Sequence, residues 1–537
     1  MDFCKYGDFS VSGELEKRLS LSFSRMISDH YDPDRFLDEK FVMDADWPGD
    51  TEGRLLLALV MLSKALGKDV CAAKKLFDKI LSLMNEDGYL GRIIDENNIN
   101  EQSLSGNSWL MRGLCEYYEW TKSPDALSAI SKMASGLFLK TKDRYYHYPM
   151  DSNMRLQNTG AESGSLTGES TNGWLPSTDI GCAFIMLDGV SHAYRILKTD
   201  ALYALLSEMI HMFSKTDLKK CAFQTHASLS CARGILRAAL ETGREDWKSE
   251  AIRQFDFYIQ NGITENYANH NWYTRPEWTE PCAIHDSFIL ATEIWRLTKN
   301  AAYLSLAHKI LYNALYRSQR ANGGFGCDNC AGEDGRMLFN KTYEAWWCCT
   351  MRGGEGLACV AKNIALEEDG VIYIPFYHPG CACLSGAEIK IESNYPYSGS
   401  AAISVFTQNG EKKTLALYKG ENTRAFSVKN ASVLKEENSF VYVEAQPGAK
   451  IEIAFELTLA KIPSRDIPGA SLITYGSLIL GHETESEIAC PDVSALTLSD
   501  EEKAVFKTAC GRTLTPLTHI TFTSEEHIAS SSIQIVF

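Results

Sequence analysis

The sequence lacks the segments that direct a chain into or across a membrane. It has no basic stretch followed by an apolar one at its start, and no apolar run in its 537 residues approaches the length of a membrane-spanning helix. It also lacks a block rich in Lys and Arg, and its formal net charge is −16. Because such a chain repels polyanions, nucleic acid is not expected as a partner. The sequence predicts a cytoplasmic protein with no membrane or nucleic-acid partner, and it leaves the oligomeric state open.

A disulfide framework is also missing. The sixteen cysteines are scattered through the chain without regular spacing, whereas disulfide scaffolds are short and dense in cysteine. Most of the thiols are therefore expected to be reduced and buried. The length suggests two or more domains with large apolar cores.

Residues 1–366 have the pattern of successive helices. Segments with good helix formers and a broad apolar face, such as 52–66, begin about twelve times in this part of the chain. Short polar turns join several of them, as at 119–127 and 296–304. A recurring helical hairpin predicts an (α/α)6 barrel, which is a closed ring of inner and outer helices; an open helical solenoid is the alternative.

The pattern changes in residues 367–537. Apolar and polar residues alternate in short segments such as 387–393, 401–406 and 450–456, and Gly, Asn, Pro and Ser separate them. This alternation predicts a C-terminal β-sandwich. Since a sandwich packed on a helical barrel usually supports the barrel, the chemistry is expected in residues 1–366.

Two adjacent cysteines, Cys348 and Cys349, are the most informative chemical feature. Neighbouring thiols rarely serve packing and commonly bind a soft metal. Upstream, Glu280 and Cys282 offer a carboxylate and a thiol two residues apart. Because Zn²⁺ takes four ligands in a tetrahedron and accepts both Cys sulfur and Glu oxygen, these four residues would complete one zinc site.

Another pair of cysteines leaves a second ligand set open. Cys327 and Cys330 form a Cys-x-x-Cys motif, which could join Cys348 and Cys349 in place of the upstream pair. That set would be a structural zinc knot and would indicate nothing about catalysis.

The stretch 261–282 is crowded with Trp, Tyr, Asn, His and acidic residues. Aromatic faces stack on the C–H surfaces of sugars while amides and His bind hydroxyls, so this mixture suits a carbohydrate pocket. His270 and Trp272 are its predicted sugar contacts. Its carboxylates are Glu265, Glu277 and Glu280. One of them could be a general acid if a partly apolar pocket raised its pKa.

On these residues the chain resembles the cysteine glycoside hydrolases typified by bacterial β-L-arabinofuranosidases, glycoside hydrolase family 127 and its relatives. In that family a Glu-x-Cys pair and a later Cys-Cys pair bind zinc, and Glu280-Pro-Cys282 and Cys348-Cys349 stand in those places. The similarity runs through most of the chain. The family's fold, an (α/α)6 barrel followed by a β-sandwich, agrees with the pattern of helices and strands described above.

The resemblance implies two catalytic residues. The family's nucleophile is the first cysteine of the adjacent pair, which falls on Cys348, and its acid/base glutamate precedes the zinc glutamate at the position where Glu265 stands. Cys348 would attack the anomeric carbon while Glu265 protonates the leaving oxygen. Glu265 would then activate water, which gives net retention. The other three zinc ligands would orient the nucleophile.

The sugar contacts implied by the resemblance are less regular. Thr350-Met351-Arg352 follows the cysteine pair in place of the family's Pro-Pro-Asn, and Asn107 stands in place of the His of a Gly-His-Leu. His226 matches a family histidine near the sugar, although a lone helical His is also typical of a core. Trp346, like its neighbour Trp347, fits a sugar platform or a core. The predicted substrate-binding residues are His226, Asn107, His270, Trp272 and Trp346.

Three classes of function fit the sequence. The first is a zinc-dependent retaining glycosidase, β-L-arabinofuranosidase-like, that acts on small carbohydrate substrates. The second is a different enzyme on a helical toroid, such as a zinc thiol-activating cyclase, which would want a zinc-bound His and an open metal position. The third is a carbohydrate-binding or structural zinc protein without hydrolase activity. A sugar trapped on Cys348 would separate the first class from the third.

Overall fold

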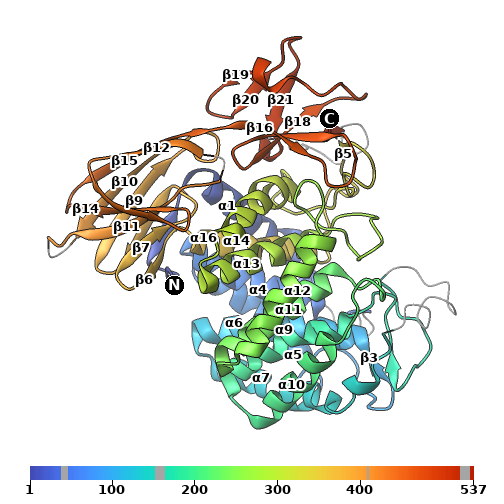
Figure 1. Cartoon of the computed structure of the whole chain (residues 1–537). Helices are drawn as coiled ribbons and strands as arrows, with labels where there is room; N and C mark the ends of the chain where they lie inside the picture. The colour runs from blue at the N-terminus through green and yellow to red at the C-terminus, as the bar shows by residue number, and fades with distance from the viewer. Residues whose placement is uncertain (38–45, 151–163, 408–409, 422, 520–531) are drawn as a thin grey trace.

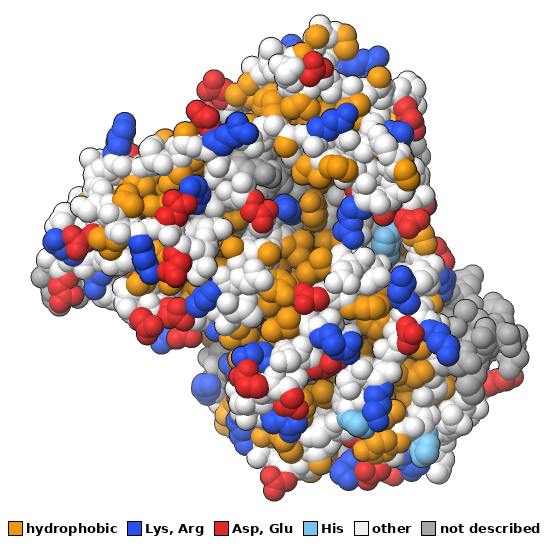
Figure 2. Space-filling model, viewed as in Figure 1, with side chains coloured by type: hydrophobic (Ala, Val, Ile, Leu, Met, Phe, Trp, Pro, Cys, Tyr) orange, Lys and Arg blue, Asp and Glu red, His pale blue; other side chains and the backbone are white. Residues whose placement is uncertain are grey.

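The computed structural model describes residues 1–37, 46–150, 164–407, 410–421, 423–519 and 532–537 (Figure 1). A helical barrel, a β-sandwich beside it and a further sheet make up the described part. None of the described helices is long and apolar enough to cross a membrane. Acidic and basic side chains are interspersed over the visible face (Figure 2).

Six helices form a closed inner ring. Each contacts the next one along the chain, and the last contacts the first. The ring consists of α4 (Asp50–Leu66), α6 (Glu101–Thr121), α9 (Met186–Leu197), α11 (Thr225–Thr242), α13 (Pro281–Thr298) and α16 (Cys349–Lys362).

Six outer helices pack against this ring. They are α1 (Gly13–Met26), α5 (Cys71–Leu83), α7 (Pro124–Gly136), α10 (Asp200–Ser214), α12 (Glu245–Asn261) and α14 (Ala301–Ile310). Each outer helix contacts an inner one, with α1 lying against both α4 and α16. The predicted (α/α)6 barrel is therefore confirmed, and the open solenoid is wrong because α16 closes the ring on α4.

The inner position of α4 follows from its sequence. Its residues 55–62 are all buried, as expected for a helix that is apolar on every face. Gly53 lets α4 approach α6 closely, since a Cβ atom there would lie 2.1 Å from the backbone nitrogen of Leu110. A larger residue at position 53 would push the two helices apart.

Two six-stranded sheets form the predicted sandwich (Figure 1). The first has the order β1 (Asp2–Phe3), β6 (Leu366–Glu368), β7 (Val371–Ile374), β11 (Lys413–Tyr418), β14 (Phe440–Ala445) and β13 (Ser432–Glu437). The second has the order β12 (Thr423–Lys429), β15 (Lys450–Leu457), β10 (Ser400–Thr407), β9 (Ala387–Ser393), β8 (Gly380–Leu384) and β2 (Phe9–Val11). Along β9 and β15 buried residues alternate with exposed ones, which confirms the predicted period of two.

The first residues of the chain belong to the sandwich and not to the barrel. β1 pairs with β6 and β2 pairs with β8, both antiparallel. These pairings bring the start of the chain back to the strands that follow α16. The predicted division at residue 366 stays a prediction, but strands on both sides of it build the same sheets.

A third sheet, which the sequence analysis did not separate from the sandwich, ends the chain. It contains β16 (Leu459–Pro463), β17 (Ser471–Tyr475), β18 (Leu478–Glu483), β21 (Thr513–Pro516), β20 (Val505–Lys507), β19 (Thr497–Asp500), β22 (Ile533–Gln534) and β5 (Met337–Leu338). β5 precedes α16 in the chain and pairs with β22. The third sheet therefore touches the segment that leads into the barrel's last inner helix.

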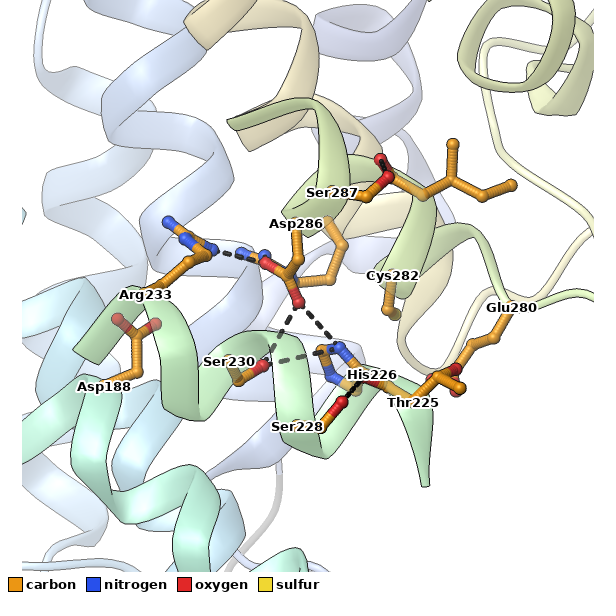
Figure 3. Close-up of polar contacts among 12 residues, drawn as sticks. Asp188, Thr225, His226, Ser228, Ser230, Arg233, Glu280, Cys282, Asp286 and Ser287 are labelled. Atoms are coloured by element: carbon orange, nitrogen blue, oxygen red, sulfur yellow. Dashed lines mark hydrogen bonds and ion pairs between the residues drawn. The ribbon is translucent and has the colours of Figure 1, made fainter. Parts of the chain in front are cut away.

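The inner helices bury ion pairs in the middle of the barrel. Asp286 on α13 is fully buried, accepts hydrogen bonds from Ser230 (3.1 Å) and Arg233 (2.5 Å) on α11, and pairs with Arg352 on α16 (Figure 3). His226 Nδ1 lies 2.8 Å from the same carboxylate. Burial raises the pKa of Asp286, but the guanidinium groups of Arg352 and Arg233 outweigh it and hold that pKa well below its usual range. Asp286 is thus a fixed anion that joins three inner helices.

We expect Asp286→Asn to lower the free energy of unfolding by about 3–5 kcal/mol, because it removes one of the two buried carboxylates that neutralise Arg233 and Arg352 and leaves Glu355 alone against both guanidinium groups. Urea unfolding of both proteins at neutral pH measures the change. Asp246→Asn is the control, since Asp246 pairs with Arg244 at the surface and its loss should change stability little. Equal unfolding midpoints for wild type and Asp286→Asn would contradict a structural role for this carboxylate.

Candidate active site

The four predicted metal ligands come together at the starts of two neighbouring inner helices. Glu280 is the N-cap of α13 and Cys282 lies in its first turn, while Cys348 is the N-cap of α16 and Cys349 is its first residue. One ligand atom from each of the four lies within 4.8 Å of all the others. Helix N-termini carry partial positive charge, so this position favours thiolate and carboxylate groups.

The spacing of the sulfur atoms suits a tetrahedral metal site. Cys349 Sγ lies 3.5 Å from Cys282 Sγ and 3.3 Å from Cys348 Sγ. A tetrahedral zinc with Zn–S bonds of about 2.3 Å separates its sulfurs by about 3.8 Å, so shifts of a few tenths of an ångström would be enough. This buried group of three thiols and one carboxylate could therefore bind a metal ion.

The alternative ligand set is not assembled. Cys330 Sγ points toward the backbone carbonyl of Asn269 at 3.9 Å. Cys327 lies beside Cys349, but among the described residues neither Cys327 nor Cys330 belongs to the ligand group. The structure thus brings together the Glu280 set and not the Cys-x-x-Cys set.

The surroundings of the group shift the pKa values of its side chains in different directions. Burial raises the pKa of Glu280 well above its usual value and that of Cys282 to about 12. Hydrogen bonds from Cys282 and Cys349 lower the pKa of Cys348. Arg54 Nη1 lies 3.5 Å from Cys282 Sγ, and its guanidinium also pairs with Asp50 at 2.8 Å. One fixed cation therefore offsets part of the negative charge that four ionised ligands would carry.

A cavity of about 470 Å³ adjoins the group. Glu280, Cys348 and Cys349 contribute to its lining. The other lining side chains include three indoles and three polar groups, from Trp272, Trp278, Trp347, Asp179, Gln224 and Asn271. Aromatic faces mixed with amides and a carboxylate are the composition of a sugar site.

Of the two tryptophans predicted to contact the sugar, Trp272 lines the cavity and Trp346 does not. The indole Nε1 of Trp272 donates to Asp179 at 3.2 Å, and its ring contacts Trp278 at 5.1 Å. Trp346 is 42% exposed, and its ring lies 5.7 Å from that of Trp347. The neighbouring Trp347, and not Trp346, belongs to the cavity wall.

Three other predicted sugar contacts are not among the described residues that line the cavity. His226 lies between Asp286 (2.8 Å) and Arg54 (3.4 Å) and stacks on Trp109. The side chain of Asn107 exchanges hydrogen bonds with the backbone of Leu90. His226 and Asn107 thus have the contacts of core residues.

His270 is also buried at the edge of the predicted loop. Its side chain is 9% exposed, and burial lowers its pKa to about 4, so the imidazole is neutral at physiological pH. Its backbone carbonyl accepts a hydrogen bond from the Thr225 hydroxyl at 2.5 Å. This places it in the packing of the loop against α11.

Glu265, the predicted acid/base, is held by residues 464–466, which follow the strand β16 of the third sheet. One carboxylate oxygen accepts hydrogen bonds from the Ser464 hydroxyl and from the backbone amides of Arg465 (2.7 Å) and Asp466 (3.0 Å). The side chain is 3% exposed and is not among the described residues that line the cavity. Glu277 is exposed and pairs with Arg275 at 2.6 Å. The catalytic role of Glu265 stays a prediction, without support from its position.

Sequence reasoning did not identify Arg54 or Asp179. The sequence could have indicated Arg54, because it is a charged residue directly before the apolar residues 55–62 of α4. Asp179 follows Ser177 and Thr178 in a segment without a motif, so nothing local marked it.

A second group of possible ligands lies at α6 and α9, formed by Glu116, Glu119 and His192. Lys64 and Arg112 lie 3.4 and 3.7 Å from Glu116, and Arg195 lies 3.3 Å from Glu119. Since these cations already neutralise the carboxylates, we assign no metal to this group.

Fold and site together define an (α/α)6-barrel protein with a thiol-rich group able to bind a metal. No protein-family model matches the chain, and a search of curated proteins found no match. Among solved structures, a GH127 β-L-arabinofuranosidase from Geobacillus stearothermophilus T6 matches with a TM-score of 0.70 at 12% identity, covering 98% of this chain and 99% of that one. A GH127 β-arabinofuranosidase matches with a TM-score of 0.68 at 12% identity, covering 100% and 97%. The predicted resemblance is thus confirmed at the level of the whole fold.

Proposed function

We propose that the protein is a zinc-dependent retaining glycoside hydrolase with a cysteine nucleophile, similar in substrate to the β-L-arabinofuranosidases whose fold it shares. One observation carries the proposal: Cys348 belongs both to the ligand group and to the wall of an aromatic, polar cavity. The thiol therefore lies where a bound sugar could meet it. The likeness of the whole chain to two enzymes described as arabinofuranosidases supports this substrate class.

Glu280, Cys282, Cys348 and Cys349 would hold the ion. Bound Zn²⁺ would keep the thiols deprotonated near neutral pH and fix their orientation. Arg54, which contacts Cys282, would stabilise the anionic set from the side of the barrel core.

The chemistry proposed for the chain's own residues has two steps. In the first, Cys348 Sγ forms a bond to the anomeric carbon as the bond to the leaving oxygen breaks, and a carboxylic acid protonates that oxygen. In the second, the same carboxylate takes a proton from water, whose oxygen displaces Cys348 from the sugar. Two inversions give net retention. The sequence predicts Glu265 as the acid/base.

The alternatives fit the site less well. A structural zinc site is closed, whereas Cys348 is half-buried and borders a cavity. A zinc enzyme of the cyclase kind would want a His ligand and an open position, and the group contains four protein ligands without His. A carbohydrate-binding protein without hydrolase activity stays the second candidate, because the cavity alone would serve it.

A panel of aryl glycosides tests the proposal. We expect 4-nitrophenyl β-L-arabinofuranoside, among pyranosides and other furanosides, to be hydrolysed with retention, and a rapid quench to show a fraction of the protein heavier by one anhydro-pentose. Peptide mapping should place that mass on Cys348. If a tightly bound sugar is recovered unchanged and no glycoside is cleaved, the protein is a binding protein and the hydrolase proposal is wrong.

A further inference from the structure

The cavity beside the ligand group has one carboxylate that the proposed zinc site does not use. Among the described residues that line it, only Asp179 and Glu280 carry carboxylates, and Glu280 is one of the four ligands. We infer that Asp179 is the acid/base of the reaction; the inference rests on the proposed function.

The fold holds Asp179 in the cavity wall. It lies in the segment between β4 (Trp174–Leu175) and α9. On one side of it Thr178 N donates to Ser165 O at 2.8 Å, and on the other Ile180 O accepts from Gln224 N at 3.2 Å. Backbone hydrogen bonds thus fix both neighbours, which limits how far Asp179 can move.

Trp272 orients the carboxylate itself. Its indole Nε1 donates to Asp179 Oδ1 at 3.2 Å, and the side chain of Asp179 is 7% exposed. Asp179 lines the same cavity as Glu280 and Cys348. A sugar that reaches Cys348 through this cavity would therefore pass an oriented carboxylate supported by an aromatic ring.

Glu265 is held by another part of the chain, the loop that follows β16. Three hydrogen bonds from residues 464–466 occupy one of its oxygens, two of them from backbone amides. A proton donor must reach the leaving oxygen within hydrogen-bonding distance, and Glu265 is not among the described cavity residues. Its carboxylate instead anchors the third sheet to the loop before α13.

Asp179 would act in both steps. Protonated, it gives its proton to the leaving oxygen as the C–O bond breaks and the C–S bond to Cys348 forms. Ionised, it takes a proton from water as the new C–O bond forms and the C–S bond breaks, which returns Asp179 to its protonated form and Cys348 to a thiolate. No other reactant is needed.

Asp179→Asn tests the inference, because asparagine keeps the size and still accepts from Trp272. With 2,4-dinitrophenyl β-L-arabinofuranoside, whose leaving group needs no proton, we expect the sugar to remain bound to Cys348 and steady turnover to fall about 10²–10⁴-fold. Azide, which needs no base, should restore part of that rate and yield the glycosyl azide. With an alkyl glycoside the first step itself should fall by a similar factor.

Two variants complete the experiment. Asp179→Glu, which keeps a carboxylic acid, should accumulate less adduct than Asp179→Asn, and a matched zinc content shows that the site is intact in both. Asp246→Asn, which removes a surface carboxylate on α12 that pairs with Arg244, should behave as wild type.

The outcomes separate the inference from the proposed function. If wild type forms the adduct on Cys348 and Asp179→Asn turns over both substrates normally, the inference alone is wrong. The same holds if Glu265→Gln, and not Asp179→Asn, shows accumulation and azide rescue. If wild type itself forms no adduct and cleaves no glycoside, the proposed function is overturned and the inference with it.

Discussion

Cys348→Ala is expected to reduce turnover of every glycoside that the wild type hydrolyses by about 10⁴-fold or more, because it removes the atom that would attack the anomeric carbon. Cys349 and Cys327 also border the cavity, but they are 1% and 7% exposed, whereas Cys348 is half-buried. Steady-state rates and the intact mass after a rapid quench measure the effect. The adduct should be absent from the variant.

Cys510→Ala is the matched control for this substitution. Cys510 is an exposed thiol between β20 and β21 of the third sheet, and it is far from the ligand group in sequence. Its loss should therefore leave both turnover and adduct unchanged. Persistent hydrolysis by Cys348→Ala, with zinc still bound, would show that the nucleophile is another group or that the route is not covalent.

The protein as purified is expected to contain about one zinc per chain, since two helix starts bring three thiols and a carboxylate within ligand distance. Cys282→Ser and Cys349→Ser should each lose most of the zinc. Their free energy of unfolding should fall by several kcal/mol, because a metal that binds only the folded state stabilises that state. Elemental analysis and denaturant unfolding, with and without a chelator, measure both changes.

Cys330→Ser distinguishes the two ligand sets. Cys330 is buried like the ligands but points toward a carbonyl of the loop, so the variant should keep its zinc. Zinc lost from Cys330→Ser and retained in Cys282→Ser would assign the metal to the Cys-x-x-Cys set and contradict the site described above.

The sequence predicted the elements whose causes are local. Residues a few positions apart make the apolar face of 52–66 and the polar turns that join successive helices. The structure has helix α4 at 50–66, and it pairs inner helices with outer ones. The ligands could be found for the same reason. A Glu-x-Cys and a Cys-Cys pair are local spacings, and the chemistry of thiolate and carboxylate does not depend on the fold.

What the sequence could not predict depends on contacts between distant segments. Glu265 has the aromatic and polar neighbours of a sugar loop, but Ser464, 199 positions later, supplies one of the hydrogen bonds that hold it away from the described cavity. Whether Trp346 or Trp347 faces the cavity depends on how the backbone enters α16. The sequence alone did not show whether His226 contacts the sugar or belongs to the core. In the structure it lies between Asp286 and Arg54, which are the neighbours of a core residue.

The sequence by itself thus predicted the fold class and two possible ligand sets that share Cys348 and Cys349, because periodicity and ligand type are properties of short segments. Only the tertiary structure decided which side chains share one cavity. Closing the ring of inner helices brings the start of α13 beside the start of α16 and places the segment before α9 against the one before α11. That closure unites Asp179, Trp272 and Cys348, since residues far apart in the chain meet where helices pack and no local pattern records the meeting.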